Sequence, residues 1–134
     1  MPHLAIELKL LIAAVGIGLI QLIIAAVAAR RQQNLAWAGG PRDEPMPPLT
    51  GVAGRLDRAF RNFMETFPFF AAAVLVAYLA GHSESALSVW GATLYVVGRA
   101  VYVPLYAAGI PRIRTLVWAV AMLGILLVIA AALA

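Results

Sequence analysis

The stretch that decides the fold reads Arg58-Ala59-Phe60-Arg61-Asn62-Phe63-Met64-Glu65-Thr66-Phe67-Pro68-Phe69, and an uncharged apolar run continues from it to Ala80. In a helix, Arg58, Arg61, Asn62 and Glu65 fall at i, i+3, i+4 and i+7, so they share one face. Polar groups that face hydrocarbon as a helix enters a bilayer are costly. The stripe therefore predicts a helix face turned towards protein, water or a ligand.

The composition predicts an integral membrane protein. Of the 134 residues, 63% are hydrophobic and only 12% are charged, whereas about 25% is usual for a soluble domain. Cysteine is absent, which excludes disulfides, thiolate metal sites and a protein thiol nucleophile. Any thiol chemistry would need a thiol that a ligand brings. No run of basic and aromatic residues points to nucleic acid.

The apolar pattern predicts an all-α fold, a four-transmembrane-helix bundle within a single domain of residues 1–134. The helices are expected at about 4–29, 55–80, 86–108 and 112–133, with a loop at 30–54 that is rich in glycine and proline. The first helix could be taken for a signal peptide because Ala26-Val27-Ala28 resembles a cleavage site. Its uncharged run from Leu10 to Ala29 spans roughly 30 Å, which favours a membrane span.

The basic residues predict the topology of the bundle. Most of them fall in the loop between the first two helices or at the helix ends on the same side: Arg30, Arg31, Arg42, Arg55, Arg58, Arg61, Arg112 and Arg114. The opposite side carries Lys9 and His82. Because basic loops stay cytoplasmic, both termini are expected on the far side. The absence of cysteine and of a sorting tail favours a bacterial inner membrane.

The third predicted helix carries a second polar face. Tyr95, Arg99, Tyr102 and Tyr106 fall at i, i+4, i+7 and i+11. Arg99 would lie roughly 15 Å below the basic surface, where an arginine costs on the order of 3 kcal/mol. Glu65 is the acidic residue at a similar depth, so we predict an Arg99–Glu65 ion pair.

Two interpretations of these polar residues remain open. An Arg–Glu pair and interfacial tyrosines can serve only to hold and anchor helices. Alternatively, the polar residues near one membrane face, Arg58, Asn62, Tyr102, Tyr106 and Arg114 among them, form a cationic cleft for an anionic, amide-rich small molecule. No Ser–His–Asp set, phosphate-binding loop or metal-ligand cluster stands out, and no metal is expected.

Residues 55–69 and 97–115 resemble the MAPEG family, the membrane-associated proteins in eicosanoid and glutathione metabolism. The first segment is similar to the signature of the family's second helix. Val97-Gly98-Arg99, Tyr102, Tyr106 and Arg112-Ile113-Arg114-Thr115 are similar to its third helix and the start of its fourth. Two positions depart from the family's pattern: Thr66 stands where some transferases carry tyrosine, and Gly54 where synthases carry glutamate.

The resemblance implies a homotrimer that binds glutathione at each subunit interface. It implies contacts from Arg58, Asn62, Glu65, Tyr102 and Tyr106, and from Arg30 or Arg31 across the subunit boundary. Arg61 and Arg99, which lie on the same polar faces, are also predicted to take part in binding. Arg114 would lie near the thiol and stabilise the thiolate, with Arg30 or Arg31 as its rival.

The implied activity is that of a glutathione-dependent transferase or peroxidase that acts on small hydrophobic electrophiles dissolved in the membrane. The alternatives are a non-catalytic protein that binds a lipid or another anionic amphiphile in the same cleft, and a small transporter subunit with Arg99 lining a pathway.

Overall fold

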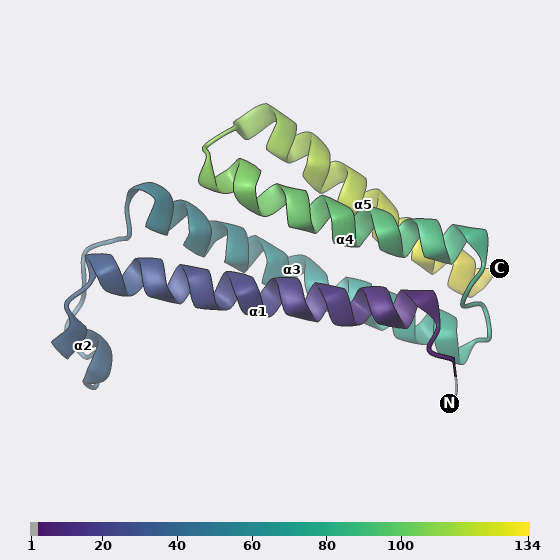
Figure 1. Ribbon diagram of the computed structural model, residues 1–134, viewed down its shortest axis with the longest axis horizontal. Helices are drawn as coiled ribbons and strands as arrows, with labels where there is room; N and C mark the ends of the chain where they lie inside the picture. The colour runs from purple at the N-terminus through teal and green to yellow at the C-terminus, as the bar shows by residue number, and fades with distance from the viewer. Residues whose placement is uncertain (1–2) are drawn as a thin grey trace.

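The computed structural model describes residues 3–134, and within this range every regular element is a helix (Figure 1). Four long helices, α1 (Ile6–Gln32), α3 (Gly51–Leu79), α4 (Ala86–Ala107) and α5 (Pro111–Leu133), are long and apolar enough to cross a membrane. A short helix, α2 (Leu35–Gly39), lies in the loop between α1 and α3. The protein is therefore a helical membrane protein with a four-helix bundle, as the sequence predicted.

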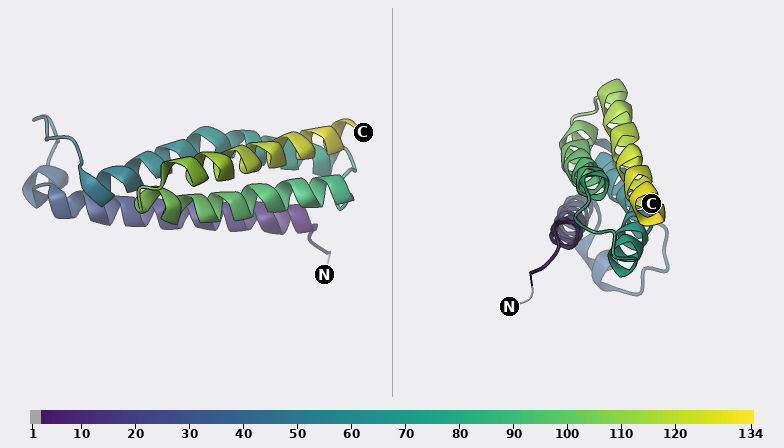
Figure 2. Two further views of the ribbon diagram at one scale, coloured as in Figure 1. Left: turned by 90° about the horizontal axis from the view of Figure 1, so that it is seen from above. Right: turned by 90° about the vertical axis from the view of Figure 1, so that its right-hand side faces the viewer.

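The four long helices run antiparallel in chain order. At one end of the bundle, here named the basic end, α1 and α4 finish and α3 and α5 begin (Figure 1). The start of α1, the C-terminus and the α3–α4 turn lie at the opposite end (Figure 2). α4 packs most extensively against α5, and α1 packs against α3 and α4. α3 and α4, the two helices with polar faces, each contact all three other long helices.

The start of α3 differs from the sequence-based boundary. The helix begins at Gly51, four residues before the expected start at residue 55, and Gly54 lies inside it. Gly51 has φ of 59°, which glycine adopts without strain. A Cβ on Gly54 would lie 2.7 Å from the carbonyl oxygen of Leu49. Glycine thus permits a close approach of the preceding loop here, rather than ending the helix.

The segment before α3 is also more ordered than a plain loop. Asn34 caps α2, because its Oδ1 accepts a hydrogen bond of 2.8 Å from the backbone N–H of Ala36. The side-chain amide of Gln32 pairs with the backbone of Thr50 through two hydrogen bonds, of 2.8 and 3.1 Å. These bonds hold the segment before α3 against the end of α1.

The core of the bundle is formed mostly by α3, α4 and α5, and α1 adds Ala14 to it. Phe70 and Tyr95 stack with ring centroids 4.1 Å apart, and the Tyr95 hydroxyl is 3.0 Å from that of Thr66. α4 and α5 touch through their backbones at Gly91 and Gly124. Large apolar side chains on α1 and α5 face outwards, as expected for surfaces in contact with lipid.

A buried carboxylate joins the helices at the end opposite the basic end. Glu7 is only 2% exposed. One of its oxygens accepts hydrogen bonds from the Ser88 hydroxyl and from the backbone N–H of Glu84. The start of α1 is therefore tied to the α3–α4 turn and to the first turn of α4.

Candidate functional site

A cleft of about 380 Å³ lies near the basic end of the bundle. The polar faces of α3 and α4 converge there, and α5 contributes Arg114 from its first turn. Its lining residues are Arg58, Arg61, Asn62, Glu65, Tyr102, Tyr106 and Arg114. Seven of the sequence-predicted site residues are thus brought together around one space.

Tyr106 lies between two guanidinium groups at this cleft. Arg58 Nε donates a hydrogen bond of 3.2 Å to the Tyr106 hydroxyl. Arg114 lies against the Tyr106 ring, with its Cζ 4.4 Å from the ring centroid, and Tyr102 meets Tyr106 edge-on at 5.6 Å. The contacts fix the two arginines relative to each other although they come from different helices.

The charges of the cleft favour an anionic ligand. Three guanidinium groups line it against one carboxylate, that of Glu65. Arg61 is partly neutralised, because its Nε lies 3.1 Å from Asp57 Oδ2 in an exposed i,i+4 pair, and such surface pairs are weak. The Nη groups of Arg58 and Arg114 can bind carboxylates in the bidentate mode that guanidinium favours.

The predicted Arg99–Glu65 ion pair is wrong. Arg99 has no exposed surface, and its Nη1 donates a hydrogen bond of 2.8 Å to Asn62 Oδ1. No Arg99–Glu65 ion pair forms among the described residues, and Glu65 is exposed in the cleft wall. The guanidinium lies instead against the Tyr102 and Phe63 rings, 4.2 and 5.7 Å from their centroids. Arg99 therefore underlies the cleft without lining it.

Arg30 and Arg31 lie elsewhere in the subunit. Both are exposed in the last turn of α1, and neither is among the residues that line the cleft. Within one chain these two arginines therefore do not join the seven predicted site residues that line the cleft.

A second hollow, here named the strap cavity, adjoins the cleft and was not expected from the sequence. It measures about 610 Å³ and shares Arg58 and Arg61 with the cleft. Its other lining residues come from the end of α1, from α2, from the segment before α3 and from the start of α3: Ala29, Gln33, Trp37, Met46, Pro47, Pro48, Leu49, Gly54 and Asp57. The Pro47-Pro48 pair beside basic helix residues is the signal that could have indicated it.

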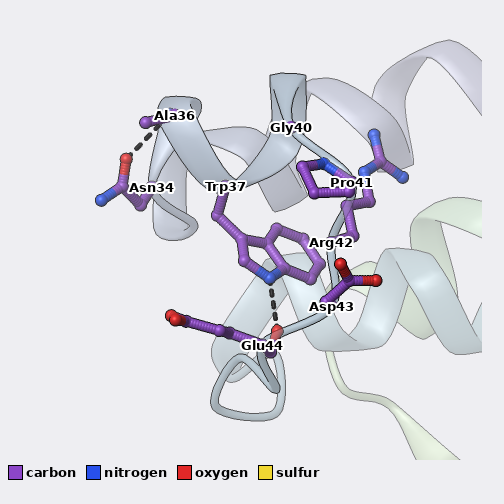
Figure 3. A pocket seen from close by; sticks show the side chains of 8 residues that line it. All are labelled: Asn34, Ala36, Trp37, Gly40, Pro41, Arg42, Asp43 and Glu44. Carbon is purple, nitrogen blue, oxygen red and sulfur yellow. Dashed lines mark hydrogen bonds between the residues drawn. The ribbon is translucent and has the colours of Figure 1, made fainter.

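A third hollow, of about 400 Å³, lies in the loop around Trp37 (Figure 3). The indole N–H of Trp37 donates a hydrogen bond to the carbonyl oxygen of Glu44, and Arg42 Cζ lies 5.6 Å from the indole ring. These contacts close the loop on itself. The hollow lacks the convergent arginines and tyrosines that distinguish the cleft.

Comparison with known proteins identifies the family. A search of curated proteins finds no match to this chain. The family model of the MAPEG family matches residues 10–134, which is nearly the whole chain and includes every residue that lines the cleft. This four-helix membrane protein therefore belongs to the MAPEG family.

Proposed function

We propose that the protein is a glutathione-dependent transferase or peroxidase whose substrates are hydrophobic electrophiles dissolved in the membrane. The observation that carries the proposal is the convergence of three arginines, an asparagine, a glutamate and two tyrosines on one cleft. Family membership supports the choice of glutathione as the thiol, and the lack of cysteine means that a reacting thiol has to come with a ligand.

The groups of glutathione complement those of the cleft. At neutral pH the tripeptide carries two carboxylates, one ammonium group, two amides and a thiol. Arg58 and Arg61 can bind carboxylate, Glu65 can accept from the ammonium group, and the tyrosine hydroxyls can bond the amides. This leaves Arg114, which packs against the Tyr106 ring, as the guanidinium available to the sulfur.

In this proposal Arg114 activates the thiol electrostatically. A free thiol has a pKa of about 8.5, so little of it is thiolate at neutral pH. A guanidinium beside the sulfur favours the thiolate and lowers that pKa. In a transferase, the thiolate forms a C–S bond to the electrophilic carbon, and the leaving group departs with its electron pair. In a peroxidase, the thiolate takes the distal oxygen of a hydroperoxide and releases an alcohol, and a second glutathione converts the sulfenic acid to disulfide and water.

The proposal includes the assembly and its membrane orientation. In a homotrimer, Arg30 or Arg31 of a neighbouring subunit would complete the cleft, although neither lines it within one chain. The basic end would face the cytoplasm of a bacterial cell, where glutathione is available, and electrophiles would enter from the surrounding lipid.

Calorimetric titration of the purified protein with glutathione tests this function. Arg114→Ala and Arg112→Ala form a matched pair, because both residues lie in the first turn of α5 and only Arg114 lines the cleft. Wild type and Arg112→Ala should bind glutathione, and ultraviolet difference absorbance should detect its thiolate. Arg114→Ala should lose the thiolate signal.

In the same experiment, Arg58→Ala tests whether this arginine contributes to the affinity for glutathione. A hydrogen bond to a charged group contributes about 1.5–3 kcal/mol, so the affinity should fall roughly 10- to 150-fold. If folded wild type binds no glutathione, or if Arg58→Ala binds it as tightly as wild type while Arg114→Ala keeps the thiolate signal, the proposed function fails.

A non-catalytic role in binding an anionic amphiphile is the second candidate. The strap cavity favours it, because apolar side chains from Trp37, Met46 and Leu49 stand beside Arg58 and Arg61 there. Under this candidate, anionic lipid raises the melting temperature in detergent and glutathione does not.

A further inference from the structure

Arg99 is a buried cation without a counterion among residues 3–134. It is fully buried, and its one hydrogen bond runs from Nη1 to Asn62 Oδ1, whereas Nε and Nη2 have no partner there. No carboxylate within the described residues lies at ion-pair distance from it. A buried guanidinium costs free energy unless it is compensated, so its place beneath the cleft calls for a physical reason.

The hydrogen bond from Arg99 fixes which way the Asn62 amide faces. Guanidinium carries donors only, so the atom of Asn62 that meets Arg99 has to be the amide oxygen. The Nδ2 group, with its two N–H donors, remains for other partners. Asn62 is half-buried and lines the cleft, so these donors are available to a ligand.

The same guanidinium supports a second cleft residue. Its Cζ lies 4.2 Å from the centroid of the Tyr102 ring, and this contact limits where the ring can lie. Arg99, which is buried and does not line the cleft, thus touches two residues that do, Asn62 and Tyr102.

We propose that Arg99 is a positioning residue: it holds Asn62 with its N–H donors turned to the cleft, so that this part of the wall selects a carboxylate. Without Arg99 the Asn62 amide is free to rotate by half a turn and present its oxygen, which repels an anion. The identity of the ligand, glutathione, rests on the proposed function. The orientation of Asn62 does not rest on the proposed function, because it follows from the hydrogen bond with Arg99.

Asn62→Asp tests the orientation in the protein without ligand. A carboxylate at this position would pair with the buried Arg99 cation, so the melting temperature in detergent should rise above that of wild type. Asn62→Ala, which removes the bond to Arg99, should lower it. A melting temperature for Asn62→Asp at or below that of wild type overturns the proposed contact, whether or not glutathione binds.

The same variant tests ligand selection. Asn62→Asp removes the donors and places an oxygen anion in their position, so the affinity for glutathione should fall by about tenfold or more. If Asn62→Asp binds glutathione as tightly as wild type does, the Asn62 N–H groups do not donate hydrogen bonds to the ligand, and the proposal is overturned.

A double-mutant cycle separates positioning from general structural damage. Arg99→Met should reduce glutathione affinity about tenfold when Asn62 is present, and have little further effect in the Asn62→Ala background. An equal loss in both backgrounds means that Arg99 acts independently of Asn62 and overturns the proposal. If Arg99→Met does not assemble, the Asn62→Asp measurements decide without the cycle.

Glutathione binding by wild type is measured first, so that the two proposals can fail separately. If wild type binds no glutathione, the proposed function fails, and the melting temperatures of Asn62→Asp and Asn62→Ala still decide the role of Arg99. If wild type binds and Asn62→Asp neither gains stability nor loses affinity, only the role of Arg99 is refuted.

Discussion

The backbone contact between α4 and α5 predicts that adding a side chain at Gly124 lowers the stability of the protein. A Cβ on Gly124 would lie 2.5 Å from the carbonyl oxygen of Gly91 and 2.8 Å from the backbone nitrogen of Tyr95. Ordinary contact begins near 3.4 Å, so Gly124→Ala forces the helices apart by about 0.9 Å. Neither neighbour can move aside as a side chain would, because both atoms belong to helical backbone.

Gly124→Ala should lower the free energy of unfolding by about 1–3 kcal/mol, the usual cost of overpacking a close contact. Chemical or thermal unfolding in detergent micelles measures it, with helix content followed by circular dichroism. Gly16→Ala is the matched control, since a Cβ there meets nothing within 4 Å. Replacing glycine by alanine inside a helix should raise the free energy of unfolding by about 0.5–1 kcal/mol.

The two variants should therefore move in opposite directions. If Gly124→Ala is as stable as wild type, α4 and α5 are not in backbone contact at this point. If Gly16→Ala is destabilised by a similar amount, the effect does not come from the close contact.

Three further substitutions test other contacts. Glu65→Gln should leave the melting temperature without ligand unchanged, because Glu65 is exposed and does not pair with Arg99; a clear drop in a thermal-shift assay would restore the ion pair. Tyr95→Phe keeps the ring stack but loses the hydrogen bond to Thr66, so unfolding in micelles should show a cost of about 1 kcal/mol. Glu7→Ala removes the acceptor of the Glu84 backbone N–H and leaves the Ser88 hydroxyl only its 3.4 Å bond to the Ser85 carbonyl, which should cost about 1–3 kcal/mol, and increased proteolysis of the α3–α4 turn should accompany it.

The class of fold follows from local sequence. A long uncharged run can satisfy its backbone in lipid only as a helix, so composition and run length are enough to predict four spans. The face of each helix that carries polar groups is equally local, because the helical period alone aligns Arg58, Asn62 and Glu65, or Tyr102 and Tyr106. The clustering of these residues in one cleft matches that expectation.

The helix boundaries show where local rules fail. Glycine and proline predict a loop at residues 30–54, yet α2 forms within this range at Leu35–Gly39 and α3 begins at Gly51. Gly54 is accommodated because the carbonyl oxygen of Leu49 occupies the space that a Cβ would need. That contact links the loop to the helix and cannot be seen from propensity alone.

The partner of Arg99 was decided only by the tertiary structure. Counting residues along two helices places Glu65 and Arg99 at a similar depth, but depth does not fix how each helix is rotated or how far it is shifted. Close packing sets both, through contacts such as Phe70 with Tyr95 and Gly91 with Gly124. In the packed bundle Asn62 meets Arg99, and Glu65 remains in the cleft wall. The sequence alone therefore determined which polar groups enter the membrane, and helix packing determined which of them touch.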